Sequence, residues 1–427
     1  MIKVIGCAIA LLTVAASCST TGKLVQIPRP ETALYPFSQV EPSIAINPVN
    51  PDQMIVGTVM DDYHYSEDGG KTWKSFTLQS PLGVYGDPVM LIDNTGRYYY
   101  FHLSNPPDGQ WLDRIVCQKA DAIGGEFDAG TSFVPNGKVH DKHWVDFDPV
   151  SGTIYMSWTQ FDKYDSKDPA DSSVILFSRS VDRGETWSAP ERISYHAGDC
   201  LDGDNTVEGA VPAAGPNGEV YVAWTGPQGI MLNTSADGGK TWLEKETKVI
   251  DHPGGWSIDV PGINRCNGLP ILVCDRSDSP HKGTLYINWA DQKNGEDDTD
   301  IWLIKSTDGG ATWSEPKRVN DDEPGKHQFF TWLTVDQSTG YLYTVFFDRR
   351  NHNDHGTDVY MAYSRDGGET FTNVKISEKP FYPDADMFFG DYNNIAAVNG
   401  EIRPVWPRMD EGKISLWIAR IRESDLK

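Results

Sequence analysis

Four side chains of this chain could carry out acid–base or nucleophilic chemistry. Asp87, Asp141 and Glu208 each stand at the start of a short segment rich in apolar residues, and Tyr392 opens another. A carboxyl group shielded from water has a raised pKa and can protonate a leaving group, and a second acidic group or a tyrosine can serve as base or nucleophile. Cleavage of a glycosidic bond needs such a pair. We therefore predict that Asp87, Asp141, Glu208 and Tyr392 are catalytic; the alternative is that each carboxylate caps loop amides.

A second set of charged and histidine side chains lies in the segments that enter or join the predicted strands. Guanidinium groups form paired hydrogen bonds with carboxylates, so arginines from separate segments could converge on one anionic group. The competing interpretation is that Asp348 pairs with Arg349, and Arg408 with Asp410, as solvated ion pairs between blades. We predict as substrate-binding residues His143, Arg265, His327, Arg349, Arg350, Asp391 and Arg408.

A repeated octapeptide indicates which elements position these residues. Its pattern is S-x-D-x-G-x-T followed by Trp or Phe, and its five copies begin at Ser66, Ser180, Ser235, Ser306 and Ser364. In each copy the Asp side chain can accept hydrogen bonds from backbone N–H groups, and glycine supplies a positive φ. The aromatic residue opens the next strand and can pack between neighbouring sheets. We expect these turns to be structural, and the repeat to set the architecture.

Seven inner strands can be counted around these turns, which predicts an all-β, seven-bladed β-propeller, with six blades as the alternative. Blade 2 has only a degenerate turn near residues 120–125, and the last blade ends after three strands. Residues 24–27 are expected to supply the missing strand and to close the ring. Residues 24–427 would then form a single domain. The predicted inner strands are residues 41–46, 87–92, 143–147, 209–213, 269–273, 330–335 and 390–395.

The octapeptide resembles the Asp box, or BNR repeat, of sialidases and other secreted propellers. The resemblance implies a ligand site on the face away from the boxes and an exo-acting, sialidase-like glycoside hydrolase. In such an enzyme Tyr392 backed by Glu208 would be the nucleophile, and three arginines would hold the substrate carboxylate. The chain departs from sialidases in its blade number and in lacking the Arg-Ile-Pro signature before the first box, since residues 27–30 read Ile-Pro-Arg-Pro.

Two other functions stay open. A polysaccharide lyase or rhamnosidase-type propeller enzyme would use histidine, tyrosine and arginine, with His143, His327, Tyr392 and Arg349 as candidates. A non-catalytic propeller would instead bind glycans or a protein through aromatic side chains near the channel. Its candidates are Trp144, Trp332 and Trp406, for which packing in the core is the simpler explanation.

The N-terminal residues predict export. Lys3 precedes an apolar run from Val4 to Ala16 that is too short to span a bilayer, so residues 1–17 have the pattern of a signal peptide. Residues 15–18, Ala-Ala-Ser-Cys, resemble a bacterial lipobox, which implies lipidation of Cys18 and a tether over residues 18–23. The expected location is membrane-anchored, on the periplasmic side or at the cell surface.

Composition narrows the partners and cofactors. The formal net charge of −24 excludes nucleic acid and anionic lipid surfaces as partners, so we expect a monomer that binds a glycan and meets the membrane only through its lipid anchor. No metal or cofactor is expected; the acidic stretch 296–300 is only a weak Ca²⁺ candidate. In an oxidising compartment Cys200 and Cys266 are the candidate disulfide, and Cys117 and Cys274 are predicted as buried thiols.

Overall fold

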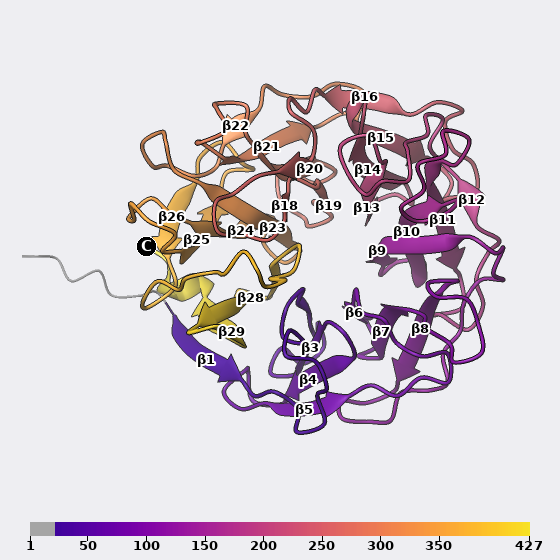
Figure 1. Ribbon diagram of the computed structural model, residues 1–427, viewed down its shortest axis with the longest axis horizontal. Helices are drawn as coiled ribbons and strands as arrows, with labels where there is room; N and C mark the ends of the chain where they lie inside the picture. The colour runs from indigo at the N-terminus through magenta and orange to yellow at the C-terminus, as the bar shows by residue number, and fades with distance from the viewer. Residues whose placement is uncertain (1–21) are drawn as a thin grey trace, which may run out of the picture.

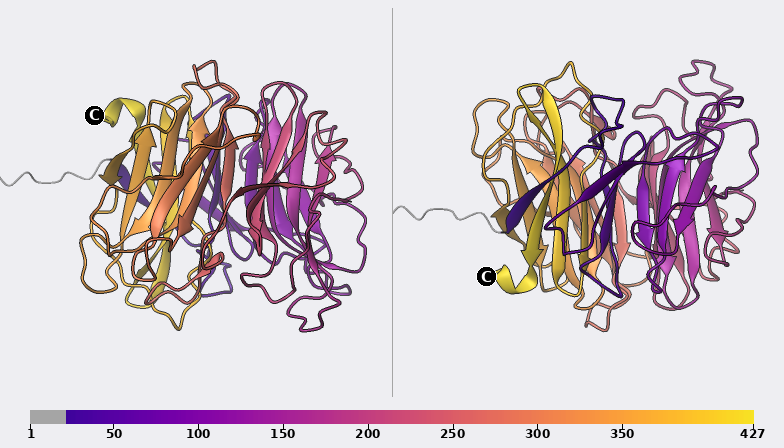
Figure 2. Two further views of the ribbon diagram at one scale, coloured as in Figure 1. Left: turned by 90° about the horizontal axis from the view of Figure 1, so that it is seen from above. Right: turned by 90° about the horizontal axis from the view of Figure 1, so that it is seen from below.

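The computed structural model describes residues 22–427, which form seven antiparallel sheets arranged as blades around a central channel (Figure 1). The seven-bladed prediction is confirmed, and the six-bladed alternative is wrong. The strands run between two faces of the ring, as both side views show (Figure 2). Within residues 22–427, no helix has the length and apolar character needed to cross a membrane.

In blades 1 to 6 the strands follow one another in chain order from the innermost outward. Blade 1 contains β2 (Ser43–Ile46), β3 (Met54–Thr58), β4 (Asp62–Ser66) and β5 (Lys74–Thr77), and blade 2 contains β6 (Val89–Ile92), β7 (Tyr98–Leu103) and β8 (Ile115–Ala120). Blade 3 contains β9 (Val139–Asp148), β10 (Thr153–Phe161), β11 (Ser173–Ser180) and β12 (Glu191–Arg192), and blade 4 contains β13 (Glu208–Ala214), β14 (Val220–Gly226), β15 (Gly229–Ser235) and β16 (Thr247–Ile250).

The second half of the chain continues the pattern. Blade 5 contains β19 (Ile271–Cys274), β20 (Leu285–Asp291), β21 (Asp300–Ser306) and β22 (Lys317–Arg318), and blade 6 contains β23 (Gln328–Asp336), β24 (Tyr341–Asp348), β25 (Asp358–Ser364) and β26 (Thr372–Lys375). Blade 7 contains β27 (Asn394–Val398), β28 (Glu401–Asp410), β29 (Lys413–Arg422) and β1 (Lys23–Ile27). A small hairpin, β17 (Ser257–Ile258) and β18 (Cys266–Asn267), lies between blades 4 and 5, and a 3-10 turn, η1 (Glu423–Asp425), follows β29.

The N-terminal strand closes the ring as expected. β1 pairs with β29 from Lys23 to Ile27, one residue earlier than the predicted start at residue 24. The views from the side show β1 beside the last strands of the chain (Figure 2). Pairing with β1 covers the outer edge of β29 and joins the two ends of the described chain in one sheet, with β1 as its outermost strand.

The five Asp boxes are confirmed as structural turns. In the first box the Ser66 hydroxyl donates to Asp68 at 2.9 Å, and Asp68 accepts the backbone N–H of Thr72 at 2.9 Å and its hydroxyl at 2.8 Å. The same contacts recur around Asp182, Asp237, Asp308 and Asp366. The box tryptophans pack against the preceding blade: the ring of Trp187 lies 5.9 Å from that of Phe101, and Trp242 lies 4.7 Å from Phe177.

The predicted disulfide is wrong. Cys200 and Cys266 are both free and buried in this structure, as are Cys117 and Cys274. Cys200 forms an isolated β-bridge with Ser166 beside blade 3, whereas Cys266 lies in β18 close to Phe330 at the start of blade 6. The two loops enter neighbouring blades, but the hairpin carries Cys266 toward the start of blade 6.

Candidate functional site

The inner strands of most blades begin with a strained or glycine residue at one face of the channel. Glu41, Asp87, Lys142 and Phe330 have φ values of 52°, 48°, 51° and 51°, and glycine occupies the corresponding places at 209 and 390. Side chains other than glycine adopt this left-handed conformation at a cost, and such residues concentrate at functional sites. In β9, β13 and β23 a register shift accompanies the strained entry, so a bulge turns additional side chains toward the channel mouth.

Asp391 is the centre of a buried ion cluster at this mouth. It pairs with Lys142 of blade 3 and accepts hydrogen bonds from Arg265, at 2.7 Å from the Arg265 Nε. Arg265 also lies 3.4 Å from Asp202. Burial alone would raise the pKa of Asp391, but Lys142 and Arg265 outweigh it and hold that pKa below its usual range. Both cations are therefore already neutralised by protein carboxylates.

Asp141 lies half-buried beside this cluster and is the carboxyl group best suited to donate a proton. Burial, and next the neighbouring charge of Asp87, raise the pKa of Asp141 to about 8. Its Oδ1 accepts only the N–H of Lys142, at 2.9 Å, among the hydrogen bonds of residues 22–427. Asp141 is thus mostly protonated at neutral pH while it remains accessible to a ligand.

Two further carboxyl groups lie beneath the accessible acids. Glu208 is fully buried, and neither of its carboxyl oxygens has a hydrogen-bond partner within residues 22–427. Burial and the nearby Asp202 raise the pKa of Glu208 well above its usual value, and burial with Asp87 does the same for Glu41. Burial thus disfavours the charged form of both groups, and because each is buried we assign them to positioning rather than to direct contact with substrate.

Aromatic rings form the floor of the site. Trp144 and Trp332 lie with their rings 4.1 Å apart, and Tyr392 stacks edge-on against Trp144 at 5.1 Å. A cavity of only about 20 Å³ separates this floor from Lys142 and Asp391, and a second cavity of about 220 Å³ lies on the other side of the two tryptophans. The rings therefore divide the channel into two halves.

Tyr392 is poorly suited to act as a nucleophile. Burial raises the pKa of its hydroxyl well above the usual value, and the neighbouring Asp87 and Glu41 raise this pKa further, which disfavours the phenolate form.

Arg265 reaches the cluster on the β17–β18 hairpin, residues 257–267, which we call the strap. The strap is held by hydrogen bonds to the segments that enter blades 4 and 7. Asn267 donates to the Asp391 carbonyl at 2.9 Å, Asn264 donates to the Ala385 carbonyl at 2.9 Å, and the Ser257 N–H donates to Asp204 at 2.8 Å. The strap thus brings a cation from between blades 4 and 5 to a carboxylate of blade 7.

Arg349 supports the strap and does not face the cluster. Its guanidinium donates to the Pro261 carbonyl at 2.6 Å and to the Thr357 hydroxyl at 3.1 Å, and it lies over the ring of Phe329. It pairs with no carboxylate among residues 22–427, and burial lowers its pKa to about 10. The substrate contact predicted for Arg349 is therefore replaced by a contact with the strap.

We expect Arg349→Ala to loosen the strap while changing global stability little, because losing two hydrogen bonds is offset by removing a desolvated cation. Hydrogen–deuterium exchange of peptides covering residues 257–267 should become faster. Arg350→Ala is the matched control, since that arginine does not touch the strap. Unchanged exchange in the Arg349 variant would contradict this role.

Arg350 and Arg408, which were also predicted to bind substrate, pair with carboxylates outside the cluster. Arg350 pairs with Asp348 and Asp321, so the partner of Asp348 is Arg350 and not Arg349. Arg408 pairs with Asp410, as the competing interpretation expected, but within one strand, and also donates to the Lys379 and Pro380 carbonyls. The three-arginine clamp implied by the sialidase resemblance is not assembled among the described residues.

The two predicted histidines contact groups outside the cluster. His143 is buried between blades 2 and 3, where burial, with His102 beside it, lowers its pKa to about 3. His327 lies 2.9 Å from the Thr299 hydroxyl near blades 5 and 6. Neither stands beside Tyr392, so the lyase-type group is not brought together. Trp406 is packed in the core of blade 7.

Several residues of the site were not predicted. Glu41 precedes the inner strand of blade 1 as Asp87 precedes that of blade 2. Its position in the repeat could therefore have predicted that Glu41 belongs to the site. Lys142 follows Asp141 directly, but nothing in the sequence links it to Asp391. Asp202 and Tyr164 are joined by a hydrogen bond of 2.7 Å, but no sequence motif indicates either residue.

The acidic stretch 296–300 uses its carboxylates within the protein. Asp298 accepts the Gly325 N–H at 2.7 Å, and Asp300 accepts from Asn320 and Asn294, each at 2.6 Å. In the part of the chain that the structure describes, no three His, Cys, Asp or Glu side chains gather as a metal site.

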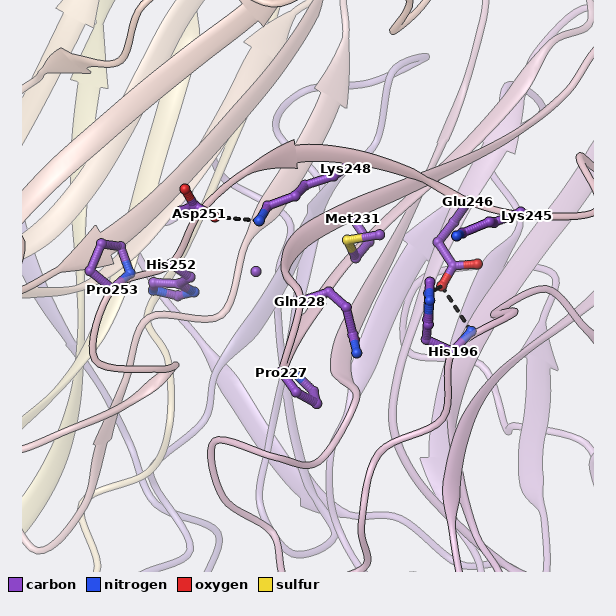
Figure 3. Close-up of a pocket in the computed structure, with 11 residues that line it drawn as sticks. His196, Pro227, Gln228, Met231, Lys245, Glu246, Lys248, Asp251, His252 and Pro253 are labelled. Carbon is purple, nitrogen blue, oxygen red and sulfur yellow. Dashed lines mark hydrogen bonds and ion pairs between the residues drawn. The ribbon is translucent and has the colours of Figure 1, made fainter.

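A larger cavity of about 640 Å³ opens on the outer edge of blade 4, away from the channel (Figure 3). Glu246 faces His196 there and accepts its ring N–H and its backbone N–H, each at 3.0 Å, together with the Tyr195 N–H at 2.6 Å. These hydrogen bonds outweigh burial and lower the pKa of Glu246. Glu246 therefore links blades 3 and 4, and both of its carboxylate oxygens accept hydrogen bonds from blade 3.

Comparison with known proteins agrees with the repeat and the fold. A family model of the BNR/Asp-box repeat matches residues 64–75. The chain carries a BNR/Asp-box repeat. A xyloglucanase from Paenibacillus sp is 25% identical over 314 residues, which are 64% of this chain but only 26% of that enzyme.

Two solved structures share the fold at low sequence identity. A polysaccharide lyase, an ulvan lyase, aligns with a TM-score of 0.52 and 13% identity over 91% of this chain and 96% of its own. A protein of unknown function from Dyadobacter fermentans aligns with a TM-score of 0.51 and 13% identity, over 94% of this chain and 99% of its own. Both likenesses concern the propeller fold.

Proposed function

We propose that this protein is a glycoside hydrolase that cleaves neutral glycans at the channel mouth, with Asp141 as the general acid. The observation that carries the proposal is an accessible carboxyl group whose pKa is raised to about 8, beside a second accessible carboxyl group, Asp87. Asp141 donates its proton to the glycosidic oxygen as the bond to the anomeric carbon breaks. Asp87 accepts a proton from the water that attacks that carbon, so water supplies the new hydroxyl group.

The charges at the mouth support a neutral substrate. Lys142 and Arg265 are the cations of the cluster, and both are paired with Asp391. An incoming carboxylate would meet Asp87 and Asp202 and would have to compete with Asp391 for both cations, which costs affinity. We therefore favour a neutral glycan over the sialic acid implied by the resemblance to sialidases and over the uronic acid substrates of lyases.

The similar proteins support polysaccharide chemistry in general. One is named as a xyloglucanase and another as an ulvan lyase, and both names describe enzymes that act on polysaccharides. We also propose that the chain is a monomeric exported lipoprotein anchored through Cys18, which lies outside the described residues.

Paired substrates that differ in one carboxyl group test this proposal. The protein without residues 1–18 would be incubated with neutral xyloglucan and arabinan, and with ulvan and its carboxyl-reduced form. We expect reducing ends to be released from a neutral glycan and ulvan to stay intact. Cleavage of ulvan with formation of an unsaturated uronic acid would favour the lyase, and release of sialic acid from a sialylated glycan would favour the sialidase.

A further inference from the structure

Two rows of partly exposed aromatic rings lie on the channel-mouth face and end at the charged cluster. The first row comes from blades 2 and 3: Tyr85 stacks edge-on against Trp111 at 5.2 Å, and Trp111 against Tyr164 at 5.6 Å. The Tyr164 hydroxyl donates to Asp202 at 2.7 Å, so this row ends at the cluster.

The second row comes from blades 1 and 7. Tyr35 lies 5.6 Å from Phe37, and Phe37 lies 6.4 Å from Phe388. The Arg265 guanidinium lies over the Phe388 ring at 5.3 Å, and the same guanidinium binds Asp391. This row therefore also ends at the cluster, from a different side of the ring.

Packing in the core accounts for only part of these rings, since Trp111 and Tyr164 pack against the core yet keep part of their surface exposed. Tyr85 and Tyr35 keep 36% and 37% of their surface exposed, and Trp111, Tyr164, Phe37 and Phe388 are half-buried. Flat rings with an apolar face and polar neighbours suit the apolar faces of sugar rings. Contiguous exposed apolar surface of this kind commonly marks a ligand site.

We infer that the two aromatic rows are subsites for a glycan chain of several sugar units, so that the cluster acts on bonds within a chain. This inference rests on the proposed function and deepens it, since it replaces the exo-acting mode implied by the resemblance with an endo-acting one. Each sugar bound along a row adds affinity without touching the reacting bond, so affinity and kcat/KM should rise with chain length.

Binding to a ladder of oligosaccharides tests the inference separately from catalysis. Xyloglucan and arabinan oligosaccharides of increasing length would be titrated calorimetrically into the Asp141→Asn variant, in which we expect turnover to be slowed by roughly 10²–10⁴. We expect affinity to increase with length for one series, and Trp111→Ala in that background to remove about tenfold of the affinity for the longest chain while leaving the shortest chain unaffected. Tyr195→Ala, at an exposed tyrosine on the outer rim, is the matched control.

Each result of these titrations either supports the aromatic subsites or overturns them. Should Trp111→Ala fail to fold, Tyr85→Ala at the exposed end of the same row and Phe37→Ala in the other row provide the same test. Affinity that does not depend on length, equal losses for short and long chains, or no binding of any chain would overturn the inference. Length-dependent binding without turnover by the wild type would overturn the proposed hydrolysis and leave the subsites standing.

Discussion

Asp141→Asn is expected to reduce the hydrolysis rate by roughly 10²–10⁴ while leaving substrate affinity nearly unchanged. The amide keeps the size of the side chain and its hydrogen bond from the Lys142 N–H, but it has no acidic proton to donate to the leaving oxygen. Steady-state kinetics on the glycan that the wild type cleaves would measure the change. Asp121→Asn, at an exposed carboxylate near the degenerate turn of blade 2, is the control and should behave as the wild type.

The pH dependence of the wild type follows from the same group. Burial and Asp87 raise the pKa of Asp141 to about 8, so the proton-donating form is present below that pH and is lost above it. We therefore expect kcat/KM to fall as the pH rises through about 8, and this alkaline limb to disappear in Asp141→Asn. An alkaline limb that persists in the variant would assign it to another group.

Removing the N-terminal strand should produce the largest loss of stability. Deletion of residues 23–27 uncovers β29 and the cluster in which Ile27 packs with Leu416 and Ile418. Unfolding in urea, followed by circular dichroism, should show a large drop in midpoint for the deletion and a loss of about 2–5 kcal/mol for Ile27→Ala. Gln26→Ala, at an exposed position of the same strand, should change little. Equal stability of the deletion variant and the wild type would contradict the closure of the ring by β1.

The repeated elements could be predicted from the sequence because their causes are local. The Ser66 box contains its own hydrogen-bond partners within four residues, and the unpaired last blade left a place for one further strand. Asp87, Asp141 and Asp391 were expected at the mouth for the same reason, since each stands at the start of an inner strand.

The contacts among blades could not be predicted in this way. Lys142 and Asp391 are 249 residues apart, and their pairing depends on the closed ring. Arg349 and Arg350 are adjacent, yet one contacts the strap and the other Asp321, because the chain turns directly after β24 ends at Asp348. No pattern in the sequence predicts the path of the strap, which places Cys266 away from Cys200.

The most direct test of Asp141 as general acid compares two leaving groups in the Asp141→Asn variant. A glycan leaving group needs protonation, whereas a dinitrophenolate leaves without it, so only the first reaction depends on the acid. We expect kcat/KM for the natural glycan to fall by roughly 10²–10⁴, while kcat/KM for the dinitrophenyl glycoside of the same sugar stays close to that of the wild type. Equal losses for both substrates would show that Asp141 is not the proton donor.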